Sequence, residues 1–150
     1  MMKKHLIPFV LSCFLLTGCV SSSQIDEVVK GTYALYNRNG TTYISYWISF
    51  SEYFPVRGFY VDMEPLRKYQ DPGLTITNTE SLPLKDPFEK NDHTIHQGME
   101  QIMMIKVEDI DRIIAEEDPL TMYFKDDWGK THSISVYYNP DVIPSVTQVP

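Results

Sequence analysis

Residues 41–51 alternate between apolar and polar side chains with a period of two, which is the repeat of a β-strand. One face of this strand would carry Ile44, Tyr46, Ile48 and Phe50, and the other Tyr43, Ser45, Trp47, Ser49 and Ser51. We expect the even-numbered face to lie in a hydrophobic core and the odd-numbered face to be polar, as in a sheet with one solvated side.

An Asn39-Gly40 pair lies between this strand and a shorter β-rich segment, 33–36. Both residue types tolerate the positive φ that a tight hairpin turn needs, so the pair predicts a hairpin. A third strand is expected over 57–61, after Pro55.

A second hairpin is expected near the carboxyl end, where 120–124 and 131–138 flank a turn at 126–129. The alternation again places one set of side chains inward: Leu120, Met122, Phe124, Ile134, Val136 and Tyr138.

Between the two hairpins, 102–107 is typical of a buried strand and 108–118 of an amphipathic helix that Pro119 ends. The apolar stripe of that helix is Val107, Ile110, Ile113 and Ile114. Residues 64–98 contain four prolines and predict a long loop, with 74–77 as a short strand inside it.

Near the amino end, Ser23 and Asp26 have the spacing of a helix capping box, which predicts a two-turn helix over about 24–30. The fold expected from these elements is α+β: a small antiparallel sheet of about five or six strands with two hairpins, one amphipathic helix packed on one face, and the short amino-terminal helix. A single domain would span 24–138, and a proline-containing tail over the surface would follow from Asn139 to Pro150.

The first residues have the order of an export signal. Lys3 and Lys4 precede an uncharged apolar stretch, 6–16, that is too short to span a bilayer as a helix. The next residues are Leu16, Thr17, Gly18 and Cys19, which resemble the lipobox of bacterial lipoproteins over residues 1–19.

That resemblance implies removal of residues 1–18 and attachment of lipid at Cys19, with 19–23 as a lipidated tether. Two or three acyl chains hold a protein on a membrane stably, and no other covalent group or cofactor is expected. In enterobacterial lipoproteins an Asp after the Cys favours the inner membrane, whereas Val20 stands here, so the resemblance implies the periplasmic side of the outer membrane.

The net charge narrows the range of possible binding partners. The chain has 13 Lys and Arg against 20 Asp and Glu, a net charge of −7 that argues against nucleic-acid binding. Cleavage before Cys19 would remove two lysines and no acid, which makes the mature chain more acidic still. It would also remove Cys13, so no disulfide is expected in the mature domain.

Catalytic patterns are sparse. His93 and His96 form a His-x-x-His beside Asp92, but the local sequence is typical of a solvated loop and no third ligand is evident, so no metal site is expected. His132 has Ser133 and Ser135 beside it, without a Gly-x-Ser-x-Gly nucleophile elbow. We therefore expect no enzyme, with an unrecognised hydrolase as the alternative.

Two groups of residues are candidates for binding a partner protein. Tyr43, Trp47 and Tyr137 would lie among Ser and Thr on the polar sheet face, where flat rings suit recognition, unless the loop at 64–98 folds over them. A second, acidic group would favour a basic partner, although acidic residues also serve solubility alone: Glu116, Glu117, Asp126 and Asp127, with Trp128 beside them.

The sequence thus favours a membrane-anchored periplasmic lipoprotein that binds a protein without catalysis. Its size, location and charge are similar to those of lipoprotein immunity proteins, which suggests an inhibitor of an envelope-acting toxin or hydrolase. The alternative is an accessory lipoprotein that helps to assemble an envelope machine such as a secretion system or pilus.

Cys19→Ser should abolish incorporation of labelled fatty acid and leave the signal peptide uncleaved at this position, because the sulfur is the acceptor of the lipid. Cys13→Ser is the matched control and should be labelled like the native chain. Labelling that survives Cys19→Ser would defeat the lipobox interpretation.

Overall fold

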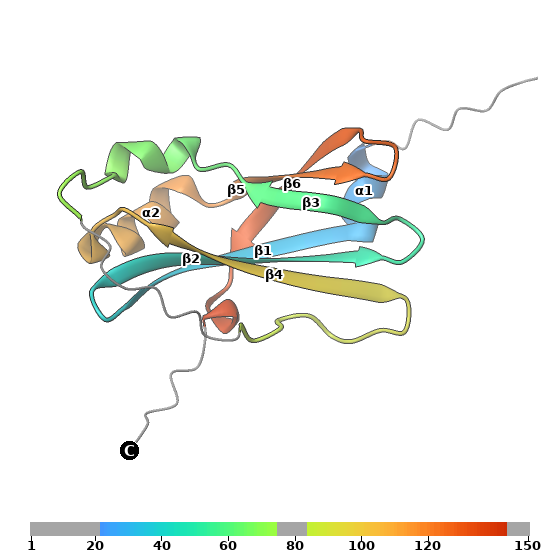
Figure 1. Cartoon of the computed structure of the whole chain (residues 1–150), viewed down its shortest axis with the longest axis horizontal. Coiled ribbons are helices and arrows are strands. Elements are labelled where there is room, and N and C mark those ends of the chain that lie inside the picture. Colours follow the sequence, from blue (N-terminus) through green and yellow to red (C-terminus); the bar gives the residue numbers. More distant parts are fainter. Residues whose placement is uncertain (1–21, 75–83, 144–150) are drawn as a thin grey trace, which may run out of the picture.

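Six strands form one mixed sheet in the order β3-β5-β6-β1-β2-β4 (Figure 1). The computed structural model describes residues 22–74 and 84–143. The strands are β1 (Val29–Arg38), β2 (Thr41–Ser51), β3 (Val56–Val61), β4 (Thr94–Met103), β5 (Leu120–Asp126) and β6 (Thr131–Tyr138). The helices are α1 (Ser22–Val28) and α2 (Ile110–Glu117), with the 3₁₀ turns η1 (Glu64–Tyr69), η2 (Val107–Asp109) and η3 (Pro140–Val142). The domain is therefore β-rich with a few short helices.

The sheet consists of two antiparallel ribbons, β1-β2-β4 and β3-β5-β6, that meet along β1 and β6. Both expected hairpins are present, as β1-β2 around Asn39-Gly40 and as β5-β6. The expected antiparallel arrangement holds for the pairs within each ribbon, but the sheet as a whole is mixed, because β1 and β6 run parallel. Alternation along a strand fixes its inward face but carries no information about the direction of its neighbour.

The core lies on the inner face of the curled sheet, and the even-numbered side chains of β2 belong to it as expected. Curling brings β3 opposite β2, where the rings of Tyr46 and Phe59 meet edge to face with centroids 5.7 Å apart. Burial in this setting raises the pKa of Tyr46 to about 12. The two strands are packed against each other and are not neighbours in the sheet.

The helices start and end at other residues than the sequence suggests. Residues 107–109 form η2, so α2 begins only at Ile110, and Val107 is 54% exposed instead of belonging to the buried stripe. Ile110 and Ile113 are buried in the core as expected. Helix α1 ends at Val28 because Val29 already pairs with Phe50 in the sheet.

The segment 64–98 is less loop-rich than expected, since it holds η1 and the first residues of β4. The strand expected at 102–107 is misplaced along the sequence: β4 ends at Met103, and Ile105 forms an isolated bridge with Gln70. The sequence obscured β4 because it is an edge strand whose side chains are mostly exposed. The short strand expected at 74–77 falls mainly outside the described residues.

The chain after β6 packs into the domain instead of trailing over its surface. The Asn139 amide donates to the Tyr33 carbonyl at 2.7 Å, and Val142 is fully buried. Ser45 Oγ donates to the Val142 carbonyl at 3.3 Å, so η3 lies against the outward side of β1 and β2. The tail expected from Asn139 is therefore wrong up to 143, and 144–150 lie outside the described residues.

In the two described stretches, no helix has both the length and the apolar character needed to cross a membrane.

Gly98→Ala should destabilise the fold, because a Cβ there would lie 2.5 Å from Cε2 of the Trp47 ring. Overpacking against a large ring lowers the free energy of unfolding by about 1–3 kcal/mol, measurable by urea denaturation. Ser133→Ala, at an exposed strand position, should stay within about 0.5 kcal/mol of the native chain. Equal stability of the two variants would contradict the packing of Trp47 on Gly98.

Candidate protein-binding face

The outward side of β1-β2-β4 is covered, which overturns the expected exposure of Tyr43 and Trp47. Tyr43 is only 4% exposed: it stacks on Tyr36 with centroids 5.7 Å apart and lies under the Arg38 guanidinium at 4.2 Å. Trp47 is half-buried over Gly98. Neither ring is free to form the proposed binding surface.

A polar cluster fixes one end of this covered side. Arg38 pairs with Glu100 at 3.2 Å, and the side chains of both are at least nine-tenths buried. The Tyr36 hydroxyl donates to the same carboxylate. Burial, and then the bond to Glu100, raise the pKa of Tyr36 above its ordinary range. Since these groups satisfy one another, the cluster holds β1 to β4 across β2.

No segment within 22–74 and 84–143 covers the outward side of β3-β5-β6. Its rows run across the three strands: Tyr60 lies beside Tyr123, and Tyr123 beside Ser133. The two tyrosine rings lie 5.4 Å apart, and Tyr60 is 57% exposed. Thr131, Ser133 and Ser135 point outward along β6, and Tyr137 is the last outward residue of the strand, at 59% exposure. This set is named the tyrosine-serine face.

Of the predicted rings only Tyr137 belongs to the tyrosine-serine face, whereas Tyr60 and Tyr123 were missed. The signal for Tyr123 was present in the sequence, since the alternation that points Met122 and Phe124 inward points it outward.

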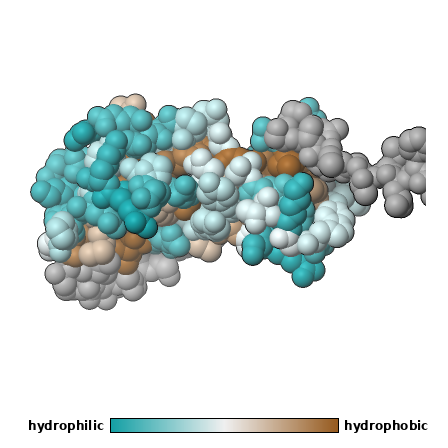
Figure 2. Space-filling model, turned by 90° about the horizontal axis from the view of Figure 1, so that it is seen from above, coloured by the Kyte–Doolittle hydropathy of each residue, from teal (hydrophilic) through white to brown (hydrophobic). Residues whose placement is uncertain are grey.

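Figure 2 shows hydrophilic residues over the half that carries η1 and paler, more mixed hydropathy toward the end with α1 and the β5–β6 turn.

A cleft of about 460 Å³ adjoins the tyrosine-serine face, where β1 and β6 diverge. Tyr137 and Ser135 form part of its wall, and Asp26 and Lys30 bring one charge of each sign. Among the described residues, the lining is formed by Asp26, Val29, Lys30, Gly31, Phe88, Ile134, Ser135 and Tyr137. Such a volume accommodates a side chain of a partner or a small molecule.

The β5–β6 turn presents Trp128, 80% exposed, next to the face. Asp126 was expected to be an exposed binding residue but is buried, and it holds the turn together. Its Oδ1 accepts from the amides of Trp128 at 3.0 Å and Lys130 at 2.9 Å, and its Oδ2 lies 2.7 Å from Nε2 of His132. Asp127 stays at the surface, where it pairs with Arg57.

Asp126 and His132 form the most buried acid–base pair among the described residues. Two aromatic rings contact the imidazole of this pair. Phe124 stacks on the imidazole with centroids 5.4 Å apart, and Phe54 meets its edge at 5.9 Å. The bond to His132 is the main cause that lowers the pKa of Asp126, aided by the amide donors. Ser133 and Ser135 point to the opposite side of β6, so they do not assemble with His132 into a nucleophilic site.

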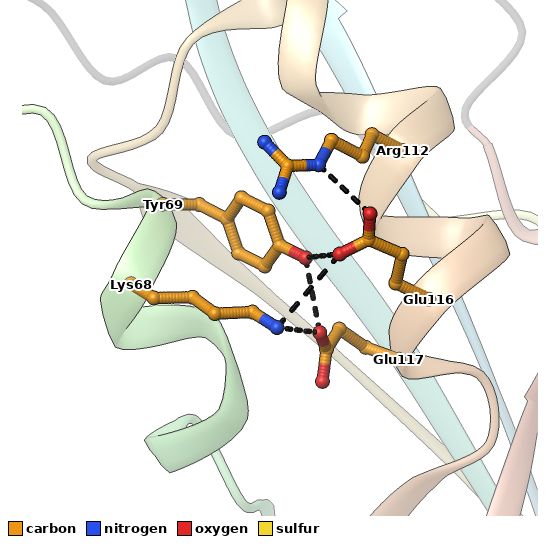
Figure 3. A network of polar contacts seen from close by, with 5 residues as sticks. All are labelled: Lys68, Tyr69, Arg112, Glu116 and Glu117. Atoms are coloured by element: carbon orange, nitrogen blue, oxygen red, sulfur yellow. Dashed lines mark hydrogen bonds and ion pairs between the residues drawn. The ribbon is translucent and has the colours of Figure 1, made fainter.

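The acidic end of α2 is largely neutralised by its neighbours (Figure 3). Tyr69 OH lies 2.7 Å from Glu116 and 3.0 Å from Glu117. Arg112 contacts Glu116 at 2.9 Å and Lys68 contacts Glu117 at 2.5 Å. The bond from Arg112 lowers the pKa of Glu116, and the bond from Lys68 that of Glu117. These carboxylates therefore join α2 to η1 instead of forming an unpaired acidic surface.

The two histidines of the His-x-x-His motif have separate carboxylate partners. Nδ1 of His93 lies 2.8 Å from Glu52, and Nδ1 of His96 lies 2.8 Å from Asp86. Residues three apart point to opposite faces of an extended chain, so the two rings do not converge. Across 22–74 and 84–143, no group of three or more His, Cys, Asp or Glu side chains is placed to hold a metal ion.

The geometry defines a small β-rich domain with one bare aromatic and hydroxyl-rich face beside a cleft. No family model matches the chain, and no curated protein or solved structure matches it either.

Asp126→Asn should lower the urea midpoint at neutral pH, because the amide replaces an acceptor of two backbone donors and of His132. A carboxyl whose pKa is lower in the folded than in the unfolded state stabilises the fold at any pH above its ordinary pKa of 3.8. This contribution is lost as the pH falls from there through the lowered pKa of the folded state. The difference between variant and native chain should therefore shrink in acid.

The neighbouring Asp127→Asn is the matched control. Its exposed pair with Arg57 contributes little, so its midpoint should follow that of the native chain. A deficit of Asp126→Asn that is the same in acid and at neutral pH would contradict the ionised, turn-holding role.

Proposed function

We propose that this protein is a lipid-anchored module of the cell envelope that binds another protein without catalysis. The observation that carries the proposal is the tyrosine-serine face, which is bare while the opposite half of the same sheet is covered.

The composition of the face suits recognition of a protein surface. Tyrosine supplies a large amphipathic contact area at low conformational cost, and small hydroxyl side chains adapt to the hydrogen bonds that a partner offers. Binding energy concentrates where an aromatic group fills a pocket. Tyr137 lies between the face and the cleft, so a partner side chain entering the cleft would contact it.

The location comes from the lipobox resemblance. Cys19 stands three positions before Ser22, the first residue of α1, so acylation there would hold the domain close to a membrane. Val20 favours the periplasmic side of the outer membrane. In that position we infer an immunity or inhibitor protein for an envelope-acting toxin or hydrolase, and the accessory role in a secretion system or pilus is the competing assignment.

A basic partner is part of the proposal on overall charge alone. The chain carries −7, which attracts cationic proteins at long range even though Glu116 and Glu117 are paired locally. Charge of this kind speeds encounter more than it strengthens the final complex.

Tyr60→Ser combined with Tyr137→Ser should weaken capture of the partner by the full-length chain, purified in detergent and used as bait for envelope and secreted fractions. Removing central aromatic anchors costs about 2 kcal/mol or more, which is roughly thirtyfold in affinity. Mass spectrometry then distinguishes a soluble toxin or hydrolase from a component of an envelope machine.

Tyr53→Ser is the matched control, since Tyr53 is even more exposed, at 75%, but lies in the turn between β2 and β3. It should capture like the native chain. If the double variant captures its partner as well as Tyr53→Ser does, the tyrosine-serine face is not the binding site.

A further inference from the structure

One side of the β4 backbone has no partner among the described residues. It lies at the end of the strand order and is ten residues long. The carbonyl of His93 accepts from Glu52 on the β2 side, whereas the carbonyl of Met104 accepts from Asp71 on the other side.

Successive residues of a strand direct their backbone groups to opposite sides. The N–H and C=O groups of His96, Gly98, Glu100 and Ile102 therefore point away from β2, and none of them has a hydrogen bond to any described residue. Thr94 and Met104 mark the two ends of this free stretch, because the Thr94 amide donates to Asn91 and the Met104 carbonyl accepts from Asp71.

The free edge has few of the features that usually prevent pairing, and its acid, Glu100, is paired with Arg38. Residues 94–103 contain no Lys, Arg or Pro, and the register with β2 has no bulge. The other edge strand, β3, is short and is interrupted by a register shift that includes Gly58 at φ +79°. Only β4 is thus a long, regular edge, and its inner face exposes Ile95, at 41%, and Met99.

On the inner face of β4, apolar and polar side chains alternate symmetrically on either side of Met99. They are Ile95, Gln97, Met99, Gln101 and Met103. In an antiparallel pair of two β4 strands with Met99 on the two-fold axis, apolar residues oppose apolar ones and Gln97 opposes Gln101. On the outer face His96 would oppose Ile102, and Gly98 would oppose Glu100, so no like charges meet.

We propose that two copies of this chain associate through β4, antiparallel and centred on Met99, to form a continuous sheet across the two-fold axis. The outward backbone groups of His96, Gly98, Glu100 and Ile102 then find partners in the second copy, as an isologous interface requires. A register centred on Gly98 would oppose Ile95 to Gln101 and Gln97 to Met99, which matches worse.

The proposed interface uses no residue of the tyrosine-serine face, since it is formed by β4 alone. It also has a defined salt dependence. Each copy carries −7 and the interface itself lacks ion pairs between the copies, so added salt screens repulsion and should strengthen the association.

Met99→Cys tests both association and register in the mature, acylated chain, which has lost Cys13 and carries lipid on Cys19, purified in detergent and oxidised in air. A residue on the axis faces its own copy in a non-hydrogen-bonded pair with Cα atoms about 4.5 Å apart, which a disulfide can bridge. The variant should run as a disulfide-linked dimer on a non-reducing gel, and the native chain and Ser133→Cys should not.

Gln97→Cys and Gln101→Cys refine the register. Each alone should remain uncrosslinked, because residue 97 lies opposite residue 101 of the other copy, and a mixture of the two variants should form the linked dimer. Crosslinks of Gln97→Cys with itself, without the mixed product, would overturn the register.

Sedimentation of the otherwise native chain completes the test. The expected mass is that of a dimer, and Met99→Lys, which places like charges opposite each other, should raise the dimer dissociation constant about tenfold. Val28→Lys, at an exposed position of α1, should leave it unchanged. A monomer at all salt concentrations, or a β4 edge that crosslinks only to a different protein, would overturn the proposal.

Discussion

The short parallel contact between β1 and β6 is the interaction on which the rest of the domain depends. Only Thr32 with Tyr137 and Tyr33 with Tyr138 are in register there. The contact is reinforced by Thr32 Oγ1, which donates to the Tyr137 carbonyl at 2.8 Å, and by the Asn139 amide on the Tyr33 carbonyl. It joins two three-stranded ribbons, each of which alone would expose an apolar face to water.

The same junction explains why the two outward sides of the sheet differ. After pairing with β1, the chain continues into η3, and Val142 lies against β1 and β2. The segment that closes the junction therefore also covers one ribbon and leaves β3-β5-β6 bare. Because β1 and β6 diverge beyond the paired residues, the cleft beside Tyr137 has this same origin.

Local pattern was sufficient for part of the fold. The alternation in β2, β5 and β6 gave the strands and their inward residues, and Asn39-Gly40 gave the first turn, because each depends on near neighbours only. Whether an outward ring is covered depends on segments far along the chain, so Tyr43 and Tyr60 could not be told apart. The burial of Asp126 was missed for another reason. From sequence alone, an acid that is exposed in a turn cannot be distinguished from one that is buried and bonds to the amides of that turn.

The sheet curls without completing its hydrogen bonding, and this constrains how the domain can assemble. Phe59 of β3 packs on Tyr46 of β2, so side chains, not backbone groups, connect β3 to the opposite ribbon. The register shift at Gly58 directs β3 away from regular pairing. Strand β4 thus cannot satisfy its outer edge within the described chain, and the regular edge that remains is suited to a strand from outside it.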